Sequence, residues 1–272
     1  MELTDTHCHI HEASALRKLT TETKVRYERA GAPLPDDMIT AAIADNVTRM
    51  ICVGTTLDDS EIAVEFAHSR KAVWASIGLH PHEAKDYAGN RRDLKRFAAL
   101  ASQPKVVAVG ECGLDYYYGH SLPADQETVL RFQIELALEH NLAMIFHVRD
   151  AFDDFWPIFD DYQRVRGVIH SFSAGRRELD QILERGLYVG LNGIMTFTNR
   201  EEQLQAAKAV PLNKLLLETD APFLTPDPYR GRICEPKHIR VTAEFLSRLR
   251  GESLQQLAAR TTENAQCIFG LR

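Results

Sequence analysis

The strongest constraint on the fold is a series of eight short apolar runs spread over the whole chain. Most of the runs are continuous stretches of Val, Ile and Leu, bounded by turn residues, rather than alternating apolar and polar residues. Continuous apolar runs are typical of strands that are covered on both faces, as in parallel sheets. We therefore predict strands at Glu2–Ile10, Val47–Gly54, Val73–Leu79, Val106–Glu111, Leu142–His147, Gly167–Ser171, Leu187–Gly190 and Leu215–Glu218.

Helical patterns lie between the apolar runs. We predict helices over Asp125–His140 and over Arg176–Arg185, the second ending before Gly186, a residue suited to a left-handed helix cap. Further helices are expected from Pro236 and after Ser253, where Ser-x-x-Gln forms a capping box. Eight strands that alternate with helices predict the α/β class, as a single-domain, TIM-like (β/α)8 barrel. A doubly wound sheet is the alternative.

One segment, near residues 12–37, interrupts this alternation. It is rich in charged residues, and glycine and proline gather in its second half. We expect a helix over its first half, Glu12–Ala30, and a proline-rich loop over the rest. The predicted organisation is therefore one barrel domain over residues 1–272 with an inserted segment after the first strand.

Composition excludes several classes of protein. The net charge of −6 argues against broad adhesion to nucleic acid, although a local basic site remains compatible with it. The five cysteines are scattered without a C-x-x-C pair, which argues against a disulfide scaffold or a zinc ribbon and for a reducing compartment. No run approaches about 18 apolar residues, and the acidic start is unlike a signal peptide. We predict a cytoplasmic protein without membrane contact.

Metal-ligating residue types stand where the predicted strands end. His7 and His9 alternate along the first strand, so both side chains point to one face and can share a cation. Four other strand ends carry similar side chains, namely Glu111, His147, His170 and Asp220. Barrel active sites are built at the carboxyl ends of the strands. Imidazole and carboxylate together suit divalent ions such as Mg, Mn, Zn or Ni, and six ligands predict two ions that share a bridging group.

Six motifs, taken in order, carry a resemblance to a known family. They are Asp5-Thr6-His7-Cys8-His9, Gly78-Leu79-His80-Pro81-His82, Gly110-Glu111-Cys112-Gly113-Leu114-Asp115, His147-Val148-Arg149-Asp150-Ala151, Ile169-His170-Ser171-Phe172-Ser173 and Glu218-Thr219-Asp220-Ala221-Pro222. The chain resembles the TatD-type metal-dependent deoxyribonucleases, a branch of the amidohydrolase superfamily, over essentially its whole length. The resemblance implies two metal sites. One is formed by His7, His9, Glu111 and Asp220, and the other by Glu111, His147 and His170, so that Glu111 bridges both ions.

The reaction expected from this site is hydrolysis of DNA phosphodiesters by a water activated between two metal ions. Asp220 is the candidate to orient that water and relay its proton, and Glu111 is the bridging catalytic carboxylate. The resemblance favours exonuclease action from a 3′ end, with single-stranded DNA or 3′ ends as the partner. Candidate substrate contacts are His80, Tyr116, Arg230 and Arg232. Tyr116 can equally pack in the protein, and His80 can equally be structural.

Two other functions fit the same residues. The ions can serve an amidohydrolase-type esterase or deacylase that acts on a small molecule or an aminoacyl-tRNA. The chain can also be a metal-binding subunit of a larger assembly with weak activity of its own.

Overall fold

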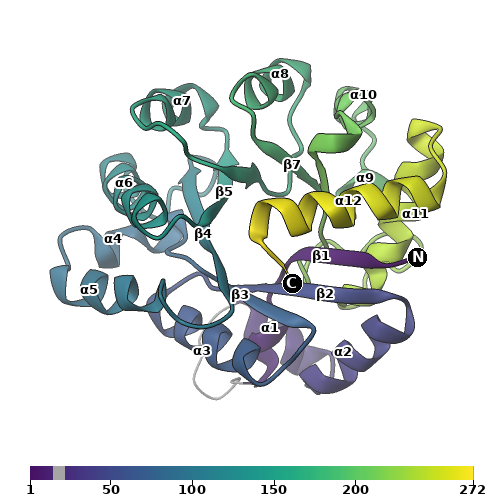
Figure 1. Ribbon diagram of the computed structural model, residues 1–272, viewed down its shortest axis with the longest axis horizontal. Helices are drawn as coiled ribbons and strands as arrows, with labels where there is room; N and C mark the ends of the chain where they lie inside the picture. The colour runs from purple at the N-terminus through teal and green to yellow at the C-terminus, as the bar shows by residue number, and fades with distance from the viewer. Residues whose placement is uncertain (15–21, 272) are drawn as a thin grey trace. The chain divides into compact units, whose positions relative to one another are not determined.

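The computed structural model describes residues 1–14 and 22–271. Its eight strands are hydrogen-bonded in the order of the sequence, and helices lie between them (Figure 1). A doubly wound sheet is excluded, because its strand order would reverse at a switch point. The α/β class and the (β/α)8 topology predicted from the apolar runs are therefore confirmed.

The chain forms two compact units. We call Met1–Cys52 together with Ser171–Arg272 the terminal unit, and Val53–His170 the central unit. The metal-ligand candidates are divided between them, because His7, His9 and Asp220 belong to the terminal unit and the other three to the central unit. The predicted domain limits, 1–272, stay a prediction.

The strands of the terminal unit are short and largely buried. They are β1 (Leu3–Cys8), β2 (Val47–Val53, of which all but the last residue belong to this unit), β7 (Tyr188–Leu191) and β8 (Leu215–Leu217). β1 is parallel to β2, β7 is parallel to β8, and Cys8 forms a further parallel bridge to Ala221. The helical segments are η1 (Ile10–Ser14), α1 (Glu22–Arg29), α2 (Pro35–Ala44), α8 (Arg176–Glu184), α9 (Ile194–Phe197), α10 (Glu201–Ala209), η3 (Leu212–Lys214), η4 (Pro236–His238), α11 (Ile239–Arg250) and α12 (Leu254–Phe269). Helix α12 packs against β1 and β8, so both ends of the chain belong to one unit (Figure 1).

The central unit repeats the strand–helix pattern. Its strands are β3 (Val73–Ile77), β4 (Val106–Asp115), β5 (Ala143–Arg149) and β6 (Gly167–Ile169), and neighbouring strands are parallel. Its helical segments are α3 (Leu57–His68), η2 (Pro81–Glu83), α4 (Ala84–Tyr87), α5 (Arg91–Leu100), α6 (Pro123–Glu139) and α7 (Phe152–Asp160). Helices α3, α6 and α7 pack against β3, β4 and β5 respectively (Figure 1).

The sequence signals at the helix ends act as expected. Ser253 caps α12 by accepting a hydrogen bond from the backbone N–H of Gln256, and a capping box is formed. Gly186 follows α8 with a φ of 70°, in the left-handed region that favours glycine. Pro236 begins the short helix η4, which leads into α11. These three local predictions are confirmed.

Strand β4 is longer than predicted. The predicted strand ends at Glu111, but the parallel ladder with β5 continues, with Gly113 opposite His147 and Asp115 opposite Arg149. The close approach requires glycine at position 113, where a Cβ would collide with the backbone carbonyl of His147. The extension places Glu111 inside the strand and brings Asp115 to its end.

The inserted segment differs from expectation in its second half. Residues 15–21, which fall within the helix predicted over Glu12–Ala30, lie outside the described residues. Within the described part, η1 and α1 are helical, and α2 begins at Pro35 where a loop was predicted. Proline fixes the φ angle that the first turn of a helix needs, and Asp36 and Asp37 favour the same turn through the helix dipole.

Among the described residues, no helix has the length and apolar character needed to cross a membrane.

Candidate metal-binding clusters

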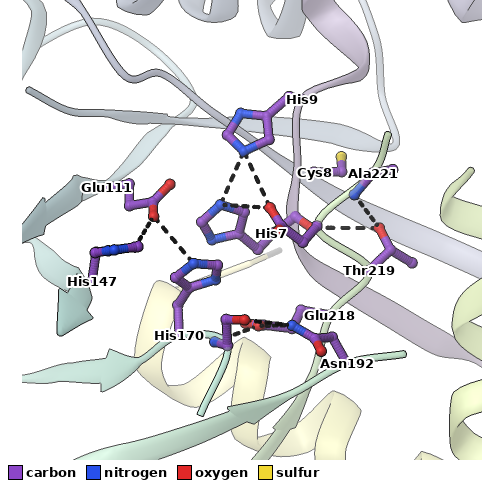
Figure 2. A network of polar contacts seen from close by, with 12 residues as sticks. His7, Cys8, His9, Glu111, His147, His170, Asn192, Glu218, Thr219 and Ala221 are labelled. Carbon is purple, nitrogen blue, oxygen red and sulfur yellow. Dashed lines mark hydrogen bonds and ion pairs between the residues drawn. The ribbon is translucent and has the colours of Figure 1, made fainter. Parts of the chain in front are cut away.

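The terminal unit gathers His7, His9 and Asp220 into one cluster, which we call the terminal cluster (Figure 2 labels the two histidines). The Nε2 atoms of the two histidines are 3.2 Å apart. Asp220 Oδ1 lies 3.7 Å from Nε2 of His7 and 3.4 Å from Nε2 of His9. His7 and His9 are buried, whereas the Asp220 side chain is 16% exposed. The strand predicted over Glu2–Ile10 ends earlier, at Cys8, but His7 in β1 and His9 directly after it still bring both imidazoles to one carboxylate.

Backbone and side-chain hydrogen bonds fix the terminal cluster. The backbone N–H of Asp220 donates to the His7 carbonyl at 2.8 Å, and that of His9 donates to the Ala221 carbonyl at 2.7 Å. Asp5, at the buried start of the same motif, accepts hydrogen bonds from the Thr219 backbone N–H and hydroxyl at 2.9 and 2.6 Å. These bonds tie β1 to the segment after β8, so the histidines and Asp220 are held together before any ion binds.

A second buried carboxylate supports the segment after β8. Glu218 Oε1 accepts hydrogen bonds from the backbone N–H of Ser171 at 2.6 Å and from the side-chain amide of Asn192 at 3.2 Å (Figure 2 labels Glu218 and Asn192). Asp5 and Glu218 lie in the motifs of the first and eighth strands, but neither residue is among the predicted site residues. Their acidic character at buried strand ends is the signal that could have identified them.

The central unit forms a cluster around Glu111, which we call the central cluster. Glu111 Oε1 lies 2.6 Å from His147 Nδ1, 3.1 Å from His170 Nε2 and 3.3 Å from His80 Nε2 (Figure 2 shows the first two contacts). The Glu111 side chain is buried. Glu111, His147 and His170 were predicted as ligands, and the structure brings all three together. His80 was predicted to contact substrate, and its imidazole lies in this cluster.

The charges in the central cluster are set by burial and by the imidazoles. Burial acts to raise the pKa of Glu111, but the positive potential of His170 and His80 and the hydrogen bonds from His147 and His170 outweigh it and hold that pKa well below its ordinary value. Burial lowers the pKa of His80 to about 4, although the Glu111 carboxylate opposes this shift. Near neutral pH, the metal-free cluster therefore offers an ionised carboxylate and a neutral imidazole.

Asp115 contacts His147 of the central cluster and was not predicted as a site residue. Its Oδ2 accepts hydrogen bonds from His147 Nε2 at 2.9 Å and His82 Nε2 at 3.0 Å. Burial acts to raise the pKa of Asp115, but these hydrogen bonds dominate and lower it well below its ordinary value. Because Nε2 of His147 is engaged by Asp115, Nδ1 is the nitrogen directed at Glu111. A carboxylate that orients a histidine in this way is a common partner of metal ligands.

The donor atoms of both clusters fit a divalent ion. Ligand atoms around a tetrahedral ion with bonds of about 2.0–2.1 Å lie about 3.3 Å apart. The three donors of the terminal cluster, separated by 3.2 to 3.7 Å, match this spacing closely. In the central unit, candidate ligand atoms of His80, Glu111 and His147 all lie within 4.8 Å of one another. Neutral imidazoles and carboxylates are the donors that zinc and its neighbouring first-row metals accept.

The other predicted substrate contacts, Tyr116, Arg230 and Arg232, differ in how far they already interact with the rest of the protein. Burial, together with the neighbouring Asp154 carboxylate, raises the pKa of Tyr116 to about 12. Arg230 donates to the Thr225 carbonyl at 2.8 Å, and its guanidinium carbon lies 3.8 Å from the centre of the Phe197 ring. Arg232 is exposed. Tyr116 and Arg230 are therefore each engaged within their own unit.

The model of the family described as TatD related DNase matches residues 4–270 of the chain. The 3′-5′ ssDNA/RNA exonuclease TatD of Citrobacter koseri is 36% identical over 244 residues, which cover 87% of this chain and 93% of that protein. The uncharacterized metal-dependent hydrolase YabD of Bacillus subtilis is 35% identical, with 86% and 92% covered. The uncharacterized metal-dependent hydrolase YcfH of Escherichia coli K12 is 34% identical over 271 residues, with 99% and 96% covered.

Solved structures show the same fold. The TatD homolog YJJV of Escherichia coli superposes with a TM-score of 0.84 at 24% identity, covering 99% of this chain and 98% of that one. A TatD family hydrolase from Entamoeba histolytica gives a TM-score of 0.87 at 21% identity, with 100% and 99% covered. At these identities the likeness establishes the fold alone.

Proposed function

Because the chain belongs to the TatD-related DNase family, we propose that this enzyme is a divalent-metal-dependent nuclease that hydrolyses DNA phosphodiester bonds. The observation that carries the proposal is the terminal cluster, in which His7, His9 and Asp220 present three donor atoms at the spacing of metal ligands. The central cluster supports it with a second set of imidazole and carboxylate donors.

We assign one ion to each cluster. His7, His9 and Asp220 would hold the first, and Glu111, His147 and His170 the second. Divalent ions at such a site lower the pKa of a coordinated water and neutralise charge on phosphoryl oxygens. Metal analysis and reconstitution with Mg, Mn, Zn or Ni would identify the ions. Bridging of both ions by Glu111 stays a prediction from the family resemblance.

The protein's own groups would orient the water and the substrate. Asp220 is the partly exposed member of the terminal cluster, and its carboxylate can accept the proton of the attacking water. Glu111 stays ionised because the surrounding imidazoles lower its pKa, so it can act as a permanent ligand and hydrogen-bond acceptor. The neutral imidazole of His80 can donate a hydrogen bond or act as a ligand without adding charge.

The substrate is proposed from the relatives. TatD of Citrobacter koseri and TatD of Salmonella typhimurium, 34% identical to this chain, are both described as 3′-5′ ssDNA/RNA exonucleases. We assign this chain the same direction of cleavage, with single-stranded DNA and 3′ ends as substrate. Arg232 is exposed and would bind a phosphate through its planar guanidinium. Arg230 would bind the same phosphate after breaking its hydrogen bond to the Thr225 carbonyl. A cytoplasmic location stays a prediction.

The test combines metal analysis with cleavage of end-labelled DNA. The protein as purified is analysed for bound metal, stripped with a chelator and reconstituted with Mg, Mn, Zn or Ni in turn. We expect shortening of 3′ ends by the loaded protein, faster on single strands than on duplexes, and no cleavage by the stripped protein. Full activity in chelator, with no metal bound, would overturn the proposal.

A panel of small esters and an aminoacyl-tRNA, assayed under the same conditions, tests the competing functions. Turnover of an ester or of the aminoacyl-tRNA without DNA cleavage would identify an esterase or deacylase. A fully metal-loaded protein that turns over none of these substrates would favour a metal-binding subunit.

A further inference from the structure

The loop that follows β4 exposes several aromatic rings. We call residues 116–122, between β4 and α6, the aromatic loop. Tyr117 and Tyr118 are 60% and 53% exposed, and His120 is also exposed. The rings of Tyr118 and His120 are stacked, with centroids 5.6 Å apart and planes inclined by 10°. Burial in the core does not account for these rings.

An arginine at the end of β5 lies over the same rings. The guanidinium carbon of Arg149 is 4.0 Å from the centre of the Tyr117 ring and 4.8 Å from that of Tyr118. Arg149 is exposed, and within residues 1–14 and 22–271 it forms no ion pair with a carboxylate. Arg131, elsewhere in the same unit, is by contrast paired with Glu127 and Asp161. The positive charge of Arg149 is therefore available to an anion.

One buried carboxylate joins the aromatic loop to the central cluster. Asp115 Oδ1 accepts the backbone N–H groups of Tyr117 at 2.9 Å and Tyr118 at 3.1 Å. Its Oδ2 accepts a hydrogen bond from His147, whose other ring nitrogen contacts Glu111. The loop is thus held in a fixed position relative to the candidate metal ligands of its own unit.

We propose that Tyr117, Tyr118 and Arg149 form a subsite that stacks an unpaired nucleobase and binds an adjoining phosphate. This inference rests on the proposed nuclease function and deepens it. Tyr117 and Tyr118 are both more than half exposed, so part of each ring is open to a base although Arg149 contacts both rings. Aromatic rings interleaved with an unpaired cation match the base and phosphate of a single strand. Bases in a duplex are already stacked on their neighbours, so the subsite selects single strands.

The test measures binding of hydrolysis-resistant phosphorothioate oligothymidylate to the metal-loaded protein by fluorescence anisotropy. Tyr117→Ala and Tyr118→Ala should each weaken binding about tenfold, the loss typical of one stacked base. Tyr117→Phe and Tyr118→Phe keep the ring and should bind as the unaltered protein does. Because both side chains are exposed, these variants should fold normally, which thermal unfolding verifies.

The contribution of Arg149 is measured by the salt dependence of binding. Arg149→Ala should weaken binding and reduce the slope of log affinity against log salt concentration by about 0.7 for a single strand. The matched controls are Arg131→Ala and Tyr162→Ala, because these residues form another Arg–Tyr contact in the central unit, but one whose arginine is already paired with carboxylates. Both controls should leave the affinity and the slope unchanged.

Abasic substitutions locate the stacked base. One abasic position along the oligonucleotide should weaken binding to the unaltered protein but have no further effect on Tyr117→Ala or Tyr118→Ala. Oligouridylate should show the same losses, because stacking does not depend on the sugar. If the unaltered protein binds the oligonucleotides but both alanine variants bind them equally well, the subsite is overturned while the nuclease function stands. If the unaltered protein neither binds nor cleaves single strands, the nuclease function itself is overturned.

Discussion

The terminal and central clusters use the same kinds of donor but hold them in different ways. In the terminal cluster His7 lies in β1 and His9 directly follows the end of that strand, and backbone hydrogen bonds bring Asp220 to both histidines. In the central cluster a buried glutamate is surrounded by imidazoles that keep it ionised. The terminal cluster is therefore preorganised by its backbone, whereas the central cluster is preorganised by the charge of its side chains.

The largest difference is expected when the central carboxylate is removed. Glu111→Ala deletes the acceptor that all three neighbouring imidazoles contact, and should lower nuclease activity by more than the about 10²–10⁴-fold typical of one proton-transfer group. The loss should be accompanied by a lower metal content, measured by elemental analysis of the purified protein. Glu111→Gln, which keeps the shape without the charge, separates loss of charge from misfolding.

His11→Ala is the control for that experiment. His11 is a buried histidine close in sequence to the terminal cluster, but it is not a predicted ligand. It should lose far less activity than Glu111→Ala. Normal turnover by the Glu111 variants would contradict the role assigned to this carboxylate.

Asp220 provides the corresponding test in the terminal cluster. Asp220→Asn keeps the backbone hydrogen bonds that position the residue but weakens its ability to accept a proton. We expect kcat to fall about 100-fold or more, while affinity for single-stranded DNA stays within a few-fold. Single-turnover kinetics and anisotropy separate the two quantities. A wild-type kcat would remove Asp220 from the mechanism.

The parts of this architecture that were predictable from sequence follow from local patterns. The continuous apolar runs indicate parallel strands wherever they occur, and the alternation of His7 and His9 follows directly from strand geometry. Cap residues such as Ser253 act within one helical turn, so a helix end can be predicted from a few neighbouring residues of the sequence. For these reasons the strand order and the local helix ends were predicted correctly.

The partners that support the ligands were not predictable in the same way. The hydrogen bonds from Thr219 to Asp5 join residues 214 positions apart, and no local pattern encodes such a pairing. The extension of β4 to Asp115 depends on its ladder with β5, which places Asp115 beside a strand distant in sequence. Tertiary contact, rather than the motif in which it lies, gives Asp115 its place behind His147.

Asp115 affects the central cluster alone, because it contacts His147 of that cluster. Asp115→Asn should replace a charged hydrogen-bond acceptor behind His147 with a neutral amide and lower metal affinity or activity by about 10–100-fold. Metal titration of the stripped protein measures the affinity. Added metal should restore much of the activity if Asp115 positions the ligand. Asp161→Asn, which alters a surface carboxylate paired with Arg131, is the control and should bind metal normally.

The smallest expected effect is a difference in proton binding within the stripped protein. Burial lowers the pKa of His80 to about 4, so its imidazole should stay neutral from pH 7 down to about pH 5 in an NMR titration. The unfolded chain takes up this proton near the ordinary value of 6.5. The contribution of His80 to stability is therefore complete above pH 6.5 and is lost as the pH falls toward 4.

His147 should behave in the opposite sense. Burial acts to lower the pKa of His147, but its hydrogen bonds to Asp115 and Glu111 outweigh burial and raise that pKa. Two imidazoles that contact one carboxylate would thus titrate on opposite sides of 6.5, and coincident titration curves would show that the side-chain charges do not preorganise the central cluster.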